Sequence, residues 1–131
     1  MPRIAIILGR LAMGGATLHA IEQALHLQRQ GHTVYFIAAP KQAHETDASH
    51  LLPSLPGLEI FSIAGFGRNL HVIDHYRTYR ALKKLLGRLR PQLVHTHTPV
   101  AGIAGRMAAA ALHLPAVHTF HGLLFEGYYP W

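Results

Sequence analysis

LVHTHTPVAGIAGRMAAAALHLPAVHTFHG, residues 93–122, contains two short apolar runs separated by a helical pattern of small residues. The runs, at 93–94 and 116–117, each lead into a histidine-rich turn. The order strand, helix, strand predicts a βαβ unit, in which the two strands are parallel. Because turns that follow neighbouring parallel strands lie at one edge of a sheet, we expect a reactive site there. Its polar candidates are His95, His97, Thr98, His118 and His121.

The N-terminal part of the chain predicts the same kind of unit. Its first apolar run, RIAIIL, is typical of a buried parallel strand, and a helical period follows a glycine-containing loop. Leu18, Ile21 and Leu25 mark the expected buried side of that helix, and Gly31 its C-terminal cap. The predicted elements are a strand over 3–8, a loop over 9–15, a helix over 16–29 and a strand over 33–39.

Strands and helices continue to alternate after residue 57. The alternation predicts an α/β protein, a Rossmann-like three-layer parallel sheet with helices on both faces. The expected apolar side of the longest helix comprises Leu70, Ile73, Tyr76, Leu82, Leu85, Leu86 and Leu89. The predicted elements are a loop with a short helical turn over 41–57, a strand over 58–63, a helix over 70–90, a strand near 92–95, a helix over about 100–112 and a strand near 116–119.

Length and composition fit one domain of 131 residues with a single core. Half of the residues are hydrophobic and 14% are charged, which excludes the disordered class. No apolar run reaches the roughly 18–20 residues that span a bilayer. Because the chain has no cysteine, it offers no disulfide framework and no thiolate metal site, and a cytoplasmic location fits. The net charge of +6 favours anionic partners.

Two glycines, Gly14 and Gly15, precede the first helix in a loop that resembles two phosphate-binding motifs and satisfies neither. The dinucleotide fingerprint needs a glycine where Leu11 stands, and a P-loop needs Lys and then Ser or Thr after its second glycine. Paired glycines let an anion approach backbone N–H groups at the positive end of a helix dipole. The alternative is a tight turn that lets the helix pack closely on the sheet. The sequence leaves both open.

The histidines offer proton transfer or metal binding. His121 follows a strand and precedes a glycine, which suits a general base at a strand's carboxyl end; the alternative is a histidine that only bonds a neighbouring loop. We expect His95 and His97 to face opposite ways on their strand. Since Glu126 is the sole carboxylate nearby in sequence, no metal site is expected. The motifs of serine and paired-carboxylate hydrolases are absent.

Basic residues cover one side of the helix predicted over 70–90. A solvated outer face is one interpretation, and adhesion to an anionic membrane at the inner face is the functional alternative. Nucleic acid is disfavoured because the sequence shows no aromatic stacking platform. The residues are Arg77, Arg80, Lys83, Lys84 and Arg88.

Four motifs together resemble the N-terminal domain of a GT-B glycosyltransferase of the retaining family 4 type. The motifs are GGAT at 14–17, QGHTV at 30–34, PQLVHTHT at 91–98 and PAVHTFHG at 115–122. The resemblance implies that this domain mainly binds the acceptor, a glycan or a lipid-linked sugar, while a second domain binds the nucleotide-sugar donor. It implies no cofactor and no metal.

The resemblance also implies roles for particular residues. Gly14 and Gly15 would approach the donor diphosphate, and His97 and Thr98 would line the acceptor side. His121 would be the active-site histidine near the transferred sugar. Gly122, which follows it, would also contact substrate.

One departure from the family is large. The second domain, with its E-x7-E pattern, is missing, so residues 1–131 are expected to be an incomplete N-terminal domain that is inactive alone. Two rivals remain. A GT-B sugar-nucleotide epimerase would need carboxylates around its histidine, and Glu126 is the nearby candidate. A non-catalytic α/β module would bind anionic membranes or sugars.

Overall fold

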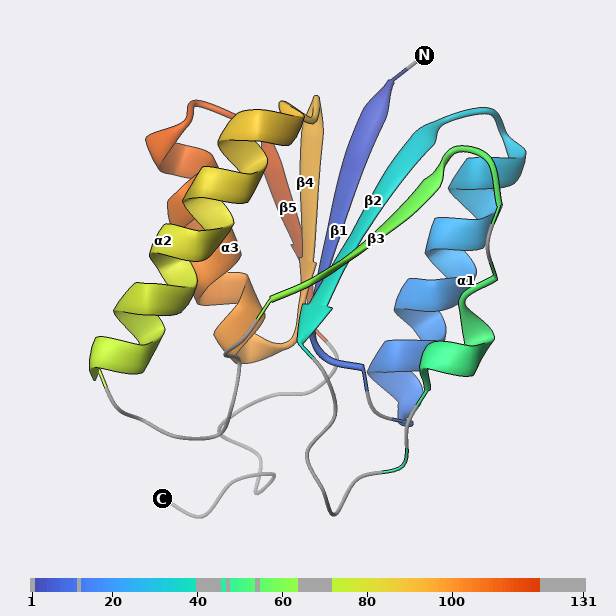
Figure 1. The fold of residues 1–131 in the computed structure, drawn as a ribbon, viewed down its shortest axis with the longest axis horizontal. Coiled ribbons are helices and arrows are strands. Elements are labelled where there is room, and N and C mark those ends of the chain that lie inside the picture. The colour runs from blue at the N-terminus through green and yellow to red at the C-terminus, as the bar shows by residue number, and fades with distance from the viewer. Residues whose placement is uncertain are drawn as a thin grey trace.

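A five-stranded parallel sheet with the strand order β3-β2-β1-β4-β5 lies at the centre of the computed structural model (Figure 1). The structure describes residues 2–11, 13–39, 46, 48–53, 55–63 and 72–120. The strands are β1 (Arg3–Arg10), β2 (Thr33–Ala39), β3 (Leu58–Ser62), β4 (Leu93–His97) and β5 (Ala116–Thr119). The helices are α1 (Gly15–Arg29), α2 (Val72–Leu89) and α3 (Pro99–Ala111), with a short 3₁₀ turn, η1 (Ser49–Leu51).

Helices cover both faces of the sheet, which confirms the predicted three-layer α/β fold. Helix α1 lies on one face, and α2 and α3 lie together on the other (Figure 1). The central strand β1 is buried on both sides, because its side chains alternate between the two layers. Ile4, Ile6 and Leu8 pack toward α1, whereas Ala5 and Ile7 pack toward α2 and α3. Each fully buried aliphatic side chain contributes about 1.5–3 kcal/mol relative to exposure.

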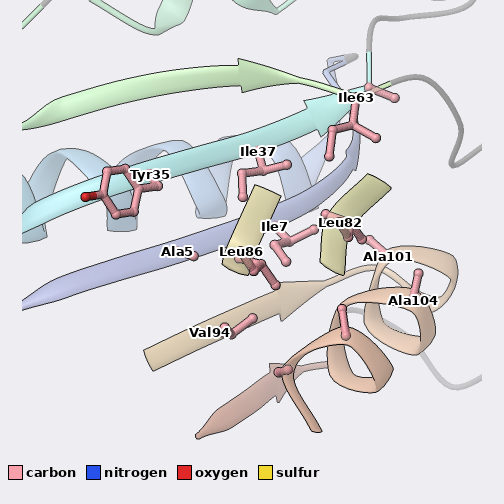
Figure 2. Close-up of a cluster of buried hydrophobic side chains, with 13 residues drawn as sticks. Ala5, Ile7, Tyr35, Ile37, Ile63, Leu82, Leu86, Val94, Ala101 and Ala104 are labelled. Carbon is pink, nitrogen blue, oxygen red and sulfur yellow. The ribbon is translucent and has the colours of Figure 1, made fainter. Parts of the chain in front are cut away.

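The core beneath α2 and α3 combines large and small side chains. Leu82 and Leu86 of α2 fill the space above Ile7 and Val94, while α3 contributes alanines (Figure 2). A Cβ placed on Gly105 would lie 2.7 Å from the Thr96 Cγ2 atom. Glycine therefore permits the close approach of α3 to β4, and this packing fixes the strand that carries the histidines.

Three sequence predictions of orientation are wrong. Leu18 is 41% exposed, because the buried stripe of α1 runs through Thr17, Ala20, Ile21 and Ala24 and leaves Leu18 at its margin. Ile73 is 67% and Tyr76 56% exposed, because the buried stripe of α2 runs through Thr78, Leu82 and Leu86 on the opposite side. Leu70 lies outside the described residues.

Strand β4 is longer than predicted. The prediction ended it near His95, whereas it continues to His97, so His97 belongs to the strand and not to the turn after it. Its parallel register with β5 places Thr96 beside His118 and His97 beside Thr119. Four polar residues thereby face their neighbours across two strands.

Candidate functional site

The carboxyl ends of β1 and β4 form the centre of the candidate site. In the strand order, β2 and β3 lie on one side of β1, and β4 and β5 lie on its other side. The strand order therefore changes direction between β1 and β4. In open α/β sheets, ligands bind outside the carboxyl ends of the strands at this kind of switch point. The last residues of β4 and β5 therefore lie where a ligand is expected.

His95 and His97 lie on the same face of β4, toward α1. Their rings stack with centroids 4.5 Å apart and an interplanar angle of 11°. The prediction that they face opposite ways is wrong, because residues two apart on a strand share a face. His97 is completely buried, and the ring of His19 from α1 meets it edge-on at 5.8 Å.

The side chain of Gln23, from α1, joins the two rings. Its Nε2 atom lies 3.0 Å from Nδ1 of His95, and its Oε1 atom lies 3.1 Å from Nε2 of His97. The other ring nitrogen of His95 lies 2.6 Å from Oγ1 of Thr119 on β5. A hydrogen-bonded chain of four side chains thus crosses β5, β4 and α1.

His118 lies on the other face of β5 and is held by its surroundings. Its Nδ1 atom lies 2.8 Å from Oγ1 of Thr96, and its ring meets that of Phe120 edge-on at 4.5 Å. A Cβ placed on Gly102 would lie 2.5 Å from Cε1 of His118. The His118 ring therefore packs directly against the backbone of Gly102, where a larger residue would clash with it. This packing favours a structural role for His118.

Thr98 is a strained residue between β4 and α3. Its φ of 69° is in the left-handed region, which is rare for a β-branched side chain. Its Oγ1 atom is buried and has no hydrogen-bond partner among the described residues; a Cβ on Gly9 would lie 3.0 Å from it. Strain of this kind costs about 1–3 kcal/mol and clusters at ligand sites.

The surroundings of Gly14 and Gly15 help to decide between anion binding and close helix packing as the reason for these two glycines. Neither has a φ that requires glycine, and a Cβ on either would meet nothing within 4 Å among the described atoms. Close packing of α1 on the sheet therefore does not explain them. The first turns of α1 and α3 contain no acidic residue, so the positive ends of both helix dipoles face the carboxyl edge uncompensated by their own side chains.

Three residues named from the sequence lie outside the described residues: His121, Gly122 and Glu126. Their predicted roles stay predictions. Within the described ranges, no three His, Asp or Glu side chains come together as a metal site would need.

The basic residues of α2 share one exposed face. Arg77, Arg80, Lys83, Lys84 and Arg88 are all exposed, and Asp74 is the sole acidic residue of the helix. The exposed Ile73 and Tyr76 lie on this same face, near the beginning of α2 at the carboxyl edge of the sheet (Figure 1). In the described part of the chain, no helix is long and apolar enough to cross a bilayer.

Sequence reasoning did not identify Gln23, Thr119 or His19. A signal for Gln23 existed: it is a long polar side chain three residues after Ala20, on the margin of the buried stripe of α1. Thr119 had no comparable signal, because its contact depends on the parallel pairing of β4 with β5.

The family profile described as Glycosyltransferase Family 4 matches residues 13–131. A curated relative from Escherichia coli, UDP-Gal:alpha-D-GlcNAc-diphosphoundecaprenol alpha-1,3-galactosyltransferase, is 39% identical over 67 residues. That match covers 50% of this chain and 17% of the relative. The chain thus matches only a small part of the curated relative.

Two solved structures have similar folds at low sequence identity. MurG of Acinetobacter baumannii is 21% identical with a TM-score of 0.64, over 88% of this chain and 34% of that protein. UDP-GlcNAc 2-epimerase of Methanocaldococcus jannaschii is 20% identical with a TM-score of 0.63, over 95% of this chain and 33% of that protein. These structural similarities show the fold. The family profile agrees with the resemblance carried by the four sequence motifs. The chain belongs to Glycosyltransferase Family 4.

Proposed function

We propose that the chain is the N-terminal, acceptor-side domain of an enzyme that transfers a sugar from a nucleotide-sugar donor to a glycan or lipid-linked acceptor, with retention of configuration. The observation that carries the proposal is the polar cluster at the carboxyl edge of a family 4 chain, in which buried His97 precedes strained Thr98. The curated relative, whose name gives a diphosphoundecaprenol-linked sugar as acceptor, favours a lipid-linked acceptor.

Each site residue has a role in this proposal. His97 and Thr98 line the acceptor side, Gly122 also contacts substrate, and His121 acts at the transferred sugar. The buried Thr98 hydroxyl, which has no hydrogen-bond partner among the described residues, supports a hydrogen bond to a substrate oxygen. No described atom lies within 4 Å of a Cβ placed on Gly14 or Gly15, which supports approach of the donor diphosphate to the positive end of α1.

Catalysis in this proposal also requires a second domain. The leaving diphosphate carries negative charge that preorganised cations and helix dipoles stabilise, and we assign those cations to that domain. The proposed reaction uses no metal and no other cofactor. The 131-residue chain alone is therefore expected to be inactive.

The exposed face of α2 supports contact with an anionic membrane. Five basic residues and one acidic residue give the helix a clear positive charge, and Ile73 and Tyr76 add an apolar and an aromatic group at its first turns. Because these turns lie at the carboxyl edge, a membrane that touches them would bring a lipid-linked acceptor near His97. Peripheral attachment of this kind does not need a spanning helix.

Epimerisation of a sugar nucleotide is the second candidate, favoured by the epimerase fold similarity. In the described residues, however, the amide of Gln23 joins His95 and His97. An amide orients rings, but it cannot accept and return protons as a carboxylate can. The cluster therefore fits binding and positioning better than proton exchange at a sugar carbon.

The test is product analysis with the intact enzyme, a panel of nucleotide sugars and a lipid-diphosphate sugar as acceptor. We expect a longer glycan on the lipid, free nucleoside diphosphate, and the same anomeric configuration in donor and product. Conversion of a nucleotide sugar into its epimer without acceptor would support the epimerase instead. Binding of lipid or sugar without any turnover across the panel would favour the non-catalytic module.

A further inference from the structure

The amide of Gln23, on α1, contacts both histidines at the end of β4. An amide nitrogen can only donate a hydrogen bond, and an amide oxygen can only accept one. At 3.0 Å, Gln23 Nε2 therefore donates to Nδ1 of His95, and at 3.1 Å, Gln23 Oε1 accepts from Nε2 of His97. One side chain thus assigns opposite roles to the two rings.

These roles fix where the ring hydrogens lie. His95 must keep Nδ1 without a hydrogen, so its hydrogen is on Nε2, which donates to the Thr119 hydroxyl at 2.6 Å. His97 must carry a hydrogen on Nε2. The hydrogen bonds run in one direction, from His97 through Gln23 and His95 to Thr119.

The stacking of the His95 and His97 rings also bears on their charge. The rings of His95 and His97 are 4.5 Å apart and nearly parallel, so a positive charge on both would be unfavourable at that distance. An imidazolium has hydrogens on both nitrogens and cannot accept from Gln23. The amide contact therefore favours the His95 tautomer whose Nδ1 carries no hydrogen, and it orients the buried His97 ring.

We infer that Gln23 is a positioning residue for the acceptor site: it sets the tautomers and ring orientations of His95 and His97, so that His97 presents one fixed edge at the end of β4. The inference rests on the proposed function for its catalytic consequence, since His97 lines the acceptor side in that proposal. The assignment of ring hydrogens does not depend on it.

The ring hydrogens are measured by long-range ¹H–¹⁵N NMR on the 131-residue chain. We expect Nε2–H tautomers for both His95 and His97 in the wild-type chain. In the Gln23→Glu variant, both carboxylate oxygens accept, so Nδ1 of His95 is expected to gain a hydrogen and its ¹⁵N shift to move into the protonated range. A hydrogen on His95 Nδ1 in the wild-type chain, or no change in the variant, overturns the inference.

The catalytic consequence is measured in the intact enzyme with Gln23→Met, which keeps the side-chain length without polar atoms. We expect kcat to fall by up to about 100-fold, as for a misplaced site group, with the donor KM nearly unchanged. The matched control is Gln28→Met on the same helix, which loses one bond to the Pro56 carbonyl and should keep kcat. Equal kcat in both variants overturns the positioning role.

The two failures are distinguishable. If no sugar transfer is found but the NMR pattern is as expected, the proposed function fails and the tautomer assignment stands. If transfer is found but His95 has the other tautomer, the inference about Gln23 fails and the proposed function stands.

Discussion

Replacing His121 by alanine in the intact enzyme is expected to lower kcat by about 100- to 10,000-fold, the usual contribution of a positioned proton-transfer group. Strand β5 ends at Thr119, whose hydroxyl terminates the hydrogen-bonded chain from His97. In the sequence, His121 follows two residues after this strand end, and ligands bind beyond the carboxyl ends of strands in open α/β sheets. Because the loss concerns a step after binding, the KM values should change little. Steady-state transfer kinetics give both parameters.

The control for this variant is His113→Asn. His113 is an exposed histidine that precedes β5 at the opposite, amino edge of the sheet, and its φ is 58°. Asparagine tolerates this left-handed conformation better than alanine does, so the fold should be unaffected. We expect the control to keep wild-type turnover. Unchanged turnover in His121→Ala would remove its catalytic role.

Charge removal from α2 should weaken binding to acidic vesicles. Arg80 and Lys84 lie one helical turn apart on the exposed face, and each basic residue near an anionic surface contributes about 1 kcal/mol. Replacing both by glutamine should therefore weaken binding by about 2 kcal/mol, or roughly 30-fold. Co-sedimentation of the chain with vesicles of acidic and zwitterionic lipids at low salt measures this.

A variant with the same change of net charge separates the α2 face from general electrostatics. Arg29 is at the end of α1 and Arg106 is on α3, and both are exposed. The double replacement Arg29→Gln and Arg106→Gln should affect vesicle binding less than the α2 pair does. Equal losses in the two variants, or equal binding to acidic and zwitterionic vesicles, would contradict the proposed membrane face.

The fold was predictable because local signals agreed with the tertiary structure. Apolar runs such as 3–8 and 33–39 became buried parallel strands, and the helical periods between them became covering helices. The errors concern residues whose environment depends on packing. Tyr76 satisfies a helical spacing with other apolar residues, but the sheet contacts the opposite stripe of α2, so its ring is exposed.

The sequence predicted where the histidines of the candidate site lie in the fold, but not which side chains they contact. Histidines after apolar runs correctly indicated the ends of β4 and β5, because parallel strands bring those ends together. The link through Gln23 joins residues 72 and 74 positions apart in sequence. Such a contact depends on how α1 crosses the sheet, and no local pattern encodes that crossing. His95 and His97 also share one face of β4, because residues two apart on a strand point the same way, so the expectation of opposite orientations was wrong.

The most direct test of the central claim is a histidine-resolved NMR titration of the 131-residue chain with a water-soluble lipid-diphosphate sugar. If the carboxyl edge of β4 and β5 is the acceptor side, the ring signals of His95 and His97 will shift on titration. The ring signals of His113 at the amino edge will not. Shifts of His95 and His97 with a nucleotide sugar alone, and none with the acceptor analogue, would contradict the claim.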